Sequence, residues 1–180
     1  VIGACEESGI TEYEIYYQAG SSVSVDTFQH SINEFSSSEG GGVCFRCIVD
    51  GKMGYASTEE LSREEAARIV DAAVDNASAL ETDDPVFLGE GGQQYAPLDM
   101  EVYDLPGTEE LIAAVLDTQK AVYEADSAVV DGTATQGICE RSQIMICNSK
   151  GLELSYVNRV AGLIAVAVVS RDGEMANGLK

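Results

Sequence analysis

The turn Asp50-Gly51 constrains the fold of this chain more than any other feature of its sequence. It separates two strand-like runs, Gly42–Val49 and Lys52–Ala56, and Asp-Gly favours a tight β-hairpin because both central residues of that turn need positive φ. Alternating polar and apolar residues also occur over Thr11–Ala19 and Ser22–His30. We therefore predict that the chain begins with an antiparallel meander.

Two longer segments change to helical spacing. Apolar residues recur every three or four positions from Ala66 to Leu80, and a capping box of Ser62 and Glu65 precedes them. A second helix is expected over Thr108–Ala125, with Thr108 as its N-cap and two glutamates in its first turn. A short helix over Val1–Ser8 is expected to end at Gly9.

Strand-like segments follow the second long helix, near Ala128–Thr135, Gln136–Cys147 and Leu152–Ser170. The order strands, helix, helix, strands predicts an α+β fold, with two main helices packed on an antiparallel or mixed sheet. The acidic, turn-rich stretch 81–107 reads as a connector over the surface. It divides a domain spanning residues 1–180 into the segments 1–80 and 108–180.

The charge of the chain argues against nucleic-acid partners. The chain contains 10 Lys and Arg and 31 Asp and Glu, which gives a formal net charge of −21. Nucleic-acid affinity depends largely on Lys and Arg that displace counterions, so direct binding of DNA or RNA is not expected. A membrane span is not expected either, because no run of about 18 apolar residues occurs.

The cysteine pattern is typical of reduced thiols. Five cysteines is an odd number, and most of them lie inside apolar runs, which favours a cytoplasmic protein over a disulfide framework. Cys44 and Cys47 have the spacing of a metal or redox pair. Residues three apart on a strand point to opposite faces, however, so packing in the core is the better interpretation.

No other motif predicts an active site. His30 is the only histidine, and a single imidazole does not make a zinc site, so a surface or edge-strand role is expected. The stretch Ser36–Gly42 lacks the ending of a P-loop and is interpreted as a flexible turn between strands. The acidic connector lacks calcium-loop spacing, and the sequon at Asn76 lies in an expected helix. We assign no catalytic, cofactor-binding or metal-ligating residue.

Two passages of the sequence resemble a known family. One runs from Ile32 to Ser38 and on through Gly42–Ser62, with the Gly-Tyr-Ala-Ser-Thr run before a helix; the other is Asn148–Leu152 with the segment after it, up to Met175. Together they resemble the N-terminal domain of the TldD/PmbA family, and they are more similar to PmbA than to TldD. This family comprises bacterial cytoplasmic proteins, known as modulators of DNA gyrase and linked to zinc metallopeptidase activity.

The resemblance implies a longer polypeptide, in which a C-terminal domain carries an H-E-x-x-x-H zinc motif in the TldD-like members. This chain has no such motif, so it is expected to be inactive alone and to hold no cofactor, with zinc expected in the other domain. The resemblance also implies a homo- or heterodimer with a TldD/PmbA-like subunit, and proteolysis of peptides or unfolded proteins.

Three functional hypotheses stay open at this point. The first is a non-catalytic domain of a metallopeptidase subunit, or of its partner subunit, that contributes to dimer assembly and peptide access. The alternative is a non-enzymatic module that binds a protein or peptide. A metal-independent hydrolase would need catalytic residues that the fold brings together.

Overall fold

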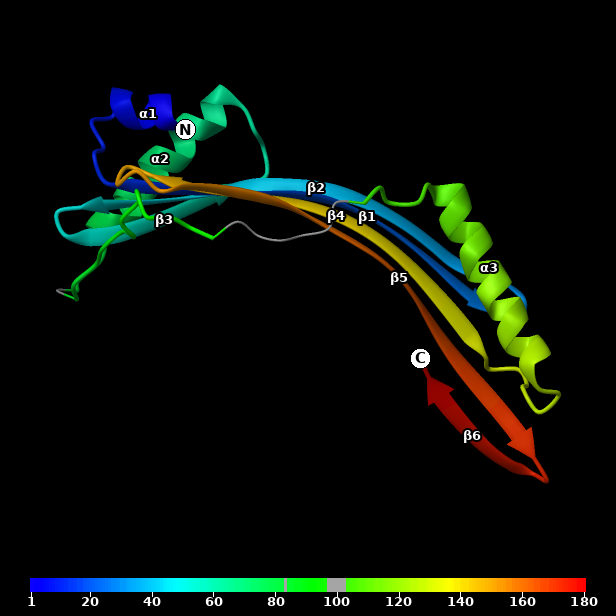
Figure 1. The fold of residues 1–180 in the computed structure, drawn as a ribbon. Coiled ribbons are helices and arrows are strands. Elements are labelled where there is room, and N and C mark those ends of the chain that lie inside the picture. Colours follow the sequence, from blue (N-terminus) through cyan, green and yellow to red (C-terminus); the bar gives the residue numbers. More distant parts are fainter. Residues whose placement is uncertain (83, 97–102) are drawn as a thin grey trace. The chain divides into compact units, whose positions relative to one another are not determined.

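A computed structural model describes residues 1–82, 84–96 and 103–180. The described helices are α1 (Ile2–Glu7), α2 (Arg63–Ser78) and α3 (Thr108–Ala125). The described strands are β1 (Tyr13–Phe28), β2 (Ser31–Val49), β3 (Lys52–Thr58), β4 (Ala134–Asn148), β5 (Glu153–Arg171) and β6 (Glu174–Leu179) (Figure 1). These strands form one antiparallel sheet in the order β3-β2-β1-β4-β5-β6. The predicted α+β class is confirmed.

Each end of the sheet is a meander with a tight Asp-Gly turn. Asp50 and Gly51 have φ of 49° and 75°, and they bring Val49 opposite Lys52 in the β2–β3 hairpin. The turn at residues 172–173 repeats this geometry between β5 and β6, with φ of 53° and 84°. The hairpin predicted from Asp-Gly is therefore confirmed, because both residues adopt the positive φ that the turn requires.

Several predicted boundaries are wrong because the strands are longer than their sequence patterns. The two runs Thr11–Ala19 and Ser22–His30 join into the single strand β1, and the expected flexible turn Ser36–Gly42 lies inside β2. A Cβ at Gly41 would meet the carbonyl oxygen of Gln18 at 2.6 Å. Glycine here permits close approach of the neighbouring strand and does not end β2.

Two further expectations need correction. Ala128–Thr135 was expected as a strand, but Val129 forms only an isolated bridge with Val169, and β4 begins at Ala134. The N-cap of α3 is Gly107 and not Thr108. The amide of Gly107 donates to the Glu110 carboxylate at 2.8 Å, so the side chain of Glu110 caps the first turn of the helix.

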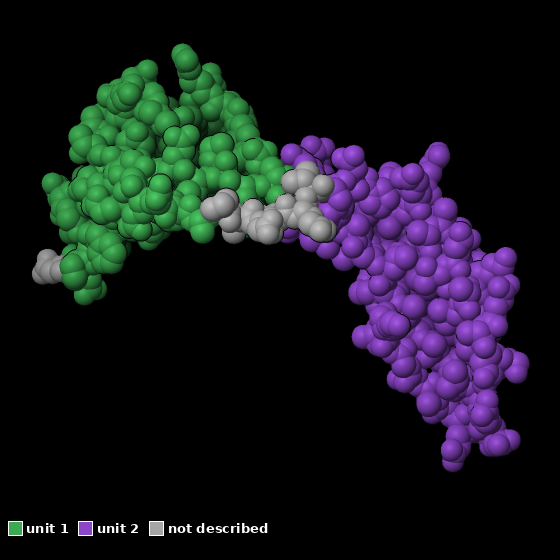
Figure 2. Space-filling view, in the orientation of Figure 1, with its two compact units in different colours: residues 1–20, 40–100, 142–157 green, residues 21–39, 101–141, 158–180 purple. Residues whose placement is uncertain are grey.

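The contacts group the chain into two compact units, coloured green and purple in Figure 2. Unit 1 comprises residues 1–20, 40–100 and 142–157, and unit 2 comprises residues 21–39, 101–141 and 158–180. The predicted connector contributes its described residues to both units. This grouping does not test whether 1–80 and 108–180 form separate subdomains, which stays a prediction.

The core of unit 1 lies between α2 and one face of the β1–β2–β3 meander. Phe45, Cys47, Ile69 and Val70 are fully or almost fully buried there, and α1 adds Cys5. Helix α2 begins as predicted at Ser62, whose hydroxyl accepts from the amide of Glu65 at 3.1 Å. The Glu65 carboxylate does not complete the capping box, because it accepts hydrogen bonds from Thr58 and Arg68 instead.

The core of unit 2 forms under α3. Leu111 and Val115 of the helix pack against Val25 of β1 and Cys139 of β4. Thr27 adds a buried polar link, since its hydroxyl donates to the carbonyl of Thr135 at 3.0 Å. Among the described helices, none is long and apolar enough to cross a membrane.

Gly54 fixes how closely α2 approaches β3. A Cβ at this position would overlap the carbonyl oxygen of Ala73 and would meet the amide of Ala77 at 2.6 Å. Backbone atoms of a packed helix cannot shift without disturbing the whole core. The helix therefore lies directly on the glycine.

We predict that Gly54→Ala destabilises the chain by about 2–4 kcal/mol, because α2 must move away from β3. Urea denaturation followed by circular dichroism measures the change. The matched control is Gly40→Ala in β2, where a Cβ has no neighbour within 4 Å and the stability should change little. Equal effects at the two glycines would show that close packing of α2 is not the reason.

Candidate functional site

A buried ion pair lies on the face of the unit 1 sheet that points away from α2. Ile15 of β1 packs into the helix-covered core, so its neighbour Glu14 points to the opposite face. Glu14 is only 6% exposed, and its carboxylate is 2.5 Å from the guanidinium of Arg46 on β2. A charge this buried needs a partner, and the short contact provides one.

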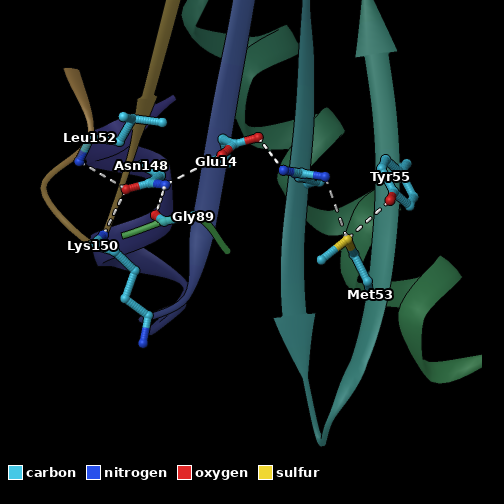
Figure 3. A network of polar contacts seen from close by, with 8 residues as sticks. Glu14, Met53, Tyr55, Gly89, Asn148, Lys150 and Leu152 are labelled. Atoms are coloured by element: carbon cyan, nitrogen blue, oxygen red, sulfur yellow. Dashed lines mark hydrogen bonds and ion pairs between the residues drawn. The ribbon is translucent and has the colours of Figure 1, made fainter. Parts of the chain in front are cut away.

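Asn148, at the end of β4, connects this pair to the surrounding backbone (Figure 3). Its side-chain amide donates to Glu14 at 3.3 Å and to the carbonyl of Gly89 at 2.8 Å. Its side-chain oxygen accepts from the amides of Lys150 and Leu152 at 2.9 and 3.1 Å. One side chain thus fixes a turn, a connector segment and the buried carboxylate.

The connector segment around Gly89 packs tightly on the same turn. The amide of Gly91 donates to the carbonyl of Lys150 at 3.0 Å, and a Cβ at Gly91 would overlap the backbone of Gly151. Leu88 is 4% exposed. Residues 89–91 of the connector are thus held against the turn that follows β4 by specific contacts.

A shallow depression of about 250 Å³ lies beside the ion pair. Its lining comes from four strands and consists of Glu14, Tyr16, Cys44, Arg46, Tyr55 and Ile146. Tyr16 and Tyr55 are 37% and 50% exposed. Within the described residues, the buried Nε of Arg46 has no hydrogen-bond acceptor.

The chemistry of this depression suits binding better than catalysis. Both oxygens of Glu14 already accept hydrogen bonds or an ion pair, from Arg46 and Asn148, so the carboxylate is held as a structural anion. Tyrosine and arginine, in contrast, are the residue types that most often form the energetic centre of protein interfaces. We take the depression as the candidate binding site of unit 1.

Of the candidate residues considered from sequence alone, Cys44 lines this depression and the others lie apart from it. His30 is exposed in the β1–β2 turn at φ 68°, and its ring centroid lies 3.9 Å from that of Tyr123. The expected surface position of His30 is confirmed. Cys47 is buried under α2 as expected, whereas Cys44 is only half-buried and lines the depression on the opposite face.

The described residues do not fit a metal site. Across 1–82, 84–96 and 103–180, no group of three or more His, Cys, Asp or Glu side chains could hold a metal ion. Asn76, the residue of the glycosylation sequon, lies in α2 as expected and donates to the carbonyl of Tyr55 at 2.8 Å. We derive no chemical step through a metal in this part of the protein.

Sequence reasoning missed Glu14, Arg46 and Asn148. A signal was present, because Arg46 is the one charged residue in the apolar run Gly42–Val49 and a charge inside such a strand needs a partner. The alternation along β1 also placed Glu14 on the face away from the apolar residues. Sequence alone did not show that these positions lie on neighbouring strands in matching register.

Two family models match this chain. The model described as PmbA/TldA metallopeptidase domain 1 matches residues 13–77, and the model described as PmbA/TldA metallopeptidase central domain matches residues 103–179. Together they cover most of the sequence. No curated protein matches the chain.

Solved structures share the fold. A protein from Thermotoga maritima, proposed as a modulator of a DNA gyrase, superposes with a TM-score of 0.84 at 19% identity, over 99% of this chain and 40% of its own. TldE from Thermococcus kodakarensis gives 0.84 at 18% identity, over 97% and 40%. A protein from Bacteroides thetaiotaomicron, also proposed as a modulator of DNA gyrase, gives 0.78 at 18%, over 98% and 41%. The chain thus spans about two fifths of the length of these proteins.

We predict that Arg46→Met destabilises the chain by about 2–4 kcal/mol, because Glu14 is left buried without its cation. The double variant Glu14→Gln/Arg46→Met should recover a large part of this loss, since it removes the unpaired charge. Urea denaturation of the four members of this double-mutant cycle measures the coupling.

The control for this cycle is the exposed pair Lys120–Glu124, with a 3.9 Å contact and side chains 71% and 68% exposed. Lys120→Met should change stability by less than about 1 kcal/mol. If Arg46→Met has an equally small effect, the buried pair contributes no stability of its own.

Burial lowers the reactivity of four of the thiols toward alkylation. It raises the pKa of Cys5 to about 11 and also raises the pKa of Cys47, Cys139 and Cys147. The reactive species is the thiolate, so we predict that iodoacetamide alkylates these four slowly at mildly alkaline pH in the folded chain and rapidly in urea. Peptide mass mapping after timed quenching measures each thiol.

The raised pKa of these thiols also determines the direction in which the stability of the fold changes with pH. A thiol whose folded pKa is raised stabilises the fold fully below its unfolded pKa, and this contribution is lost as pH rises through the folded value. Stability should therefore fall above about pH 9, and less steeply in Cys5→Ala. Rapid native alkylation of all four thiols would contradict their burial.

Proposed function

Because the chain belongs to the PmbA/TldA metallopeptidase family, we propose that it is a non-catalytic part of a metallopeptidase subunit, or of the partner subunit of one. In this role it contributes to assembly of a homo- or heterodimer with a TldD/PmbA-like subunit. It also contributes to the access of peptides or unfolded proteins to the site of proteolysis. Zinc is held by another domain of the TldD-like subunit, which is this polypeptide or its partner.

The two family matches carry this proposal, since they extend over residues 13–77 and 103–179 and both descriptions name a metallopeptidase. The length supports it, because the chain corresponds to about 40% of its solved relatives and most of each relative lies outside the match. The exposed tyrosines beside Arg46 support a surface that contacts other protein chains. The five cysteines, an odd number and all free in the structure, support a cytoplasmic location, where cysteines stay reduced.

Direct binding of nucleic acid does not form part of the proposal. A net charge of −21 repels phosphate, and the gyrase-related names belong to the solved relatives. An effect on a DNA enzyme is explained more simply by a contact between this protein and another protein.

The test is proteolysis by the intact polypeptide together with its TldD/PmbA-like partner. We expect an unstructured peptide to be cleaved in the presence of zinc, and cleavage to stop when a chelator is added. Mass spectrometry of the products measures it, and each subunit alone is the control. Absence of cleavage under all these conditions would contradict the peptidase role, and stable capture of the uncleaved peptide would favour a non-enzymatic binding module.

A further inference from the structure

A groove of about 560 Å³ lies in unit 2, between α3 and the strands β5 and β6. Thr118 and Val122 of α3 form its wall. Ala165 and Ala167 of β5 and Gly178 of β6 form its floor. All of these residues belong to unit 2, so the groove is a feature of one compact unit.

The groove exists because α3 covers only part of the sheet. Leu111 and Val115 of the helix pack against β1 and β4. A Cβ at Gly137 would lie within 3.1 Å of the side chains of Leu111, Val115 and Leu163, so Leu163 of β5 faces the helix as well. The contacts of α3 with the sheet thus extend to β5 at Leu163.

The floor of the groove consists of small side chains. Ala165 and Ala167 share the face of Leu163 by the alternation along β5, and the pairing Ala167↔Gly178 extends this face to β6. Every residue of β6, Glu174–Leu179, is exposed. A large apolar area on the helix side of the sheet is therefore open.

The flank of α3 that faces the groove also has small side chains. Tyr123 marks the opposite flank, because its ring centroid lies 3.9 Å from that of His30 in the β1–β2 turn. Helical geometry places Ala114 and Ala121 next to Thr118, on the flank away from Tyr123. Small side chains allow a second helix to pack at the short end of the usual interaxial range, about 8 Å.

An α-helix is the element that fits a groove of this kind. A sheet in a layered fold buries its face under neighbouring helices, and the groove occupies the position beside α3. An irregular segment would place unpaired amide and carbonyl groups over an apolar floor, whereas a helix pairs its own. A helix of about three turns would match the stretch of α3 from Ala114 to Ala125.

Acidic residues along α3 favour a helix with basic side chains. Asp117 and Glu124 are both exposed and lie one heptad apart, just outside Ala114 and Ala121. Lysine or arginine on a docked helix would meet these carboxylates, as at the flanks of coiled coils. A second copy of this chain, with a net charge of −21, would bring further acidic residues instead.

The same polypeptide is the source that best explains the position of the groove. Lys180 lines it, and the backbone of Lys180 pairs with Ala165 at 3.0 and 3.1 Å. The family model matched at residues 103–179 describes a central domain, and the match covers only 40% of the first two solved relatives. A segment tethered at Lys180 has a high effective concentration at the groove.

We propose that a helix that follows Lys180 in the intact polypeptide docks in this groove, beside α3, with lysine or arginine facing Asp117 and Glu124. The helix completes the layer over β5 and β6 and so joins this part of the polypeptide to the part that follows. This inference goes beyond the proposed function, because it holds whether or not the protein cleaves peptides.

Photo-cross-linking of the intact polypeptide tests the occupant of the groove. Photo-leucine replaces leucine with little change of shape, and Leu163 lines the groove and is 42% exposed. We expect irradiation to join Leu163 to the segment that follows Lys180, as mapped by mass spectrometry of the peptides. Absence of any cross-link between Leu163 and this segment would overturn the proposal.

A mixture of isotope-labelled and unlabelled polypeptide identifies the source of the cross-linked peptide. We expect both peptides of each cross-link to carry the same label, since the helix belongs to the same molecule. Mixed labels would assign the groove to a second copy, and a peptide of another protein would assign it to a partner. Either result overturns the proposal.

Gly178→Phe tests the groove by filling it. A Cβ at Gly178 meets nothing within 4 Å, so the described residues leave room at this position, whereas a docked helix would not. We expect the Leu163 cross-link to fall roughly tenfold or more, and the urea midpoint of unfolding of the intact polypeptide to decrease. Gly178→Ala leaves most of the groove open and should keep the cross-link. Equal yields from Gly178→Phe and Gly178→Ala would contradict docking on this face.

Asp117→Lys/Glu124→Lys tests the acidic flank of α3. Repulsion from a basic helix should lower the urea midpoint of the intact polypeptide below that of a matched control, and added salt should reduce this difference. The control is Asp71→Lys/Asp75→Lys, which makes the same change of charge at exposed positions of α2 in unit 1. Equal midpoints for the two variants would show that only overall charge matters and would overturn a basic helix as the occupant.

Discussion

The alternation of side chains along β1 is the constraint on which the rest of the structure depends. Odd-numbered residues of this strand enter both hydrophobic cores, Ile15 under α2 in unit 1 and Val25 under α3 in unit 2. A shift of one residue in the pairing of β1 would turn these side chains to the other face and expose its core residues in both units. The same alternation turns Glu14 away from the core, where Arg46 and Asn148 hold it.

Local rules of the sequence predicted the parts of the fold that depend on neighbouring residues. The Asp50-Gly51 hairpin, the start of α2 at Ser62 and the α+β class follow from turn chemistry, capping and periodicity. The expected turn at Ser36–Gly42 was wrong for a reason outside the segment itself. Gly41 lies against the backbone of β1, and its serine neighbours pair with serines of that strand, so tertiary contacts overrode the local preference.

The candidate depression could be predicted less well than the fold, because it depends on pairing between strands that are far apart in sequence. Asn148 lies more than a hundred residues after Glu14, and only the sheet order brings them within hydrogen-bond distance. Its full set of hydrogen bonds gives a physical reason for the Asn148–Leu152 turn, which belongs to one of the two passages that resemble the family. The resemblance to TldD/PmbA proteins indicated the family from such segments before their contacts were visible, and the family matches confirm it.

The order of the strands also determines how the chain reaches its native state. The hairpins β2–β3 and β5–β6 join strands separated by two-residue turns, and such hairpins close on the microsecond scale. The pairing of β1 with β4 must instead wait for a loop of more than a hundred residues to close, which is slow for entropic reasons. Until then both strands have an unpaired side, so the central seam of the sheet is the place where folding competes with aggregation.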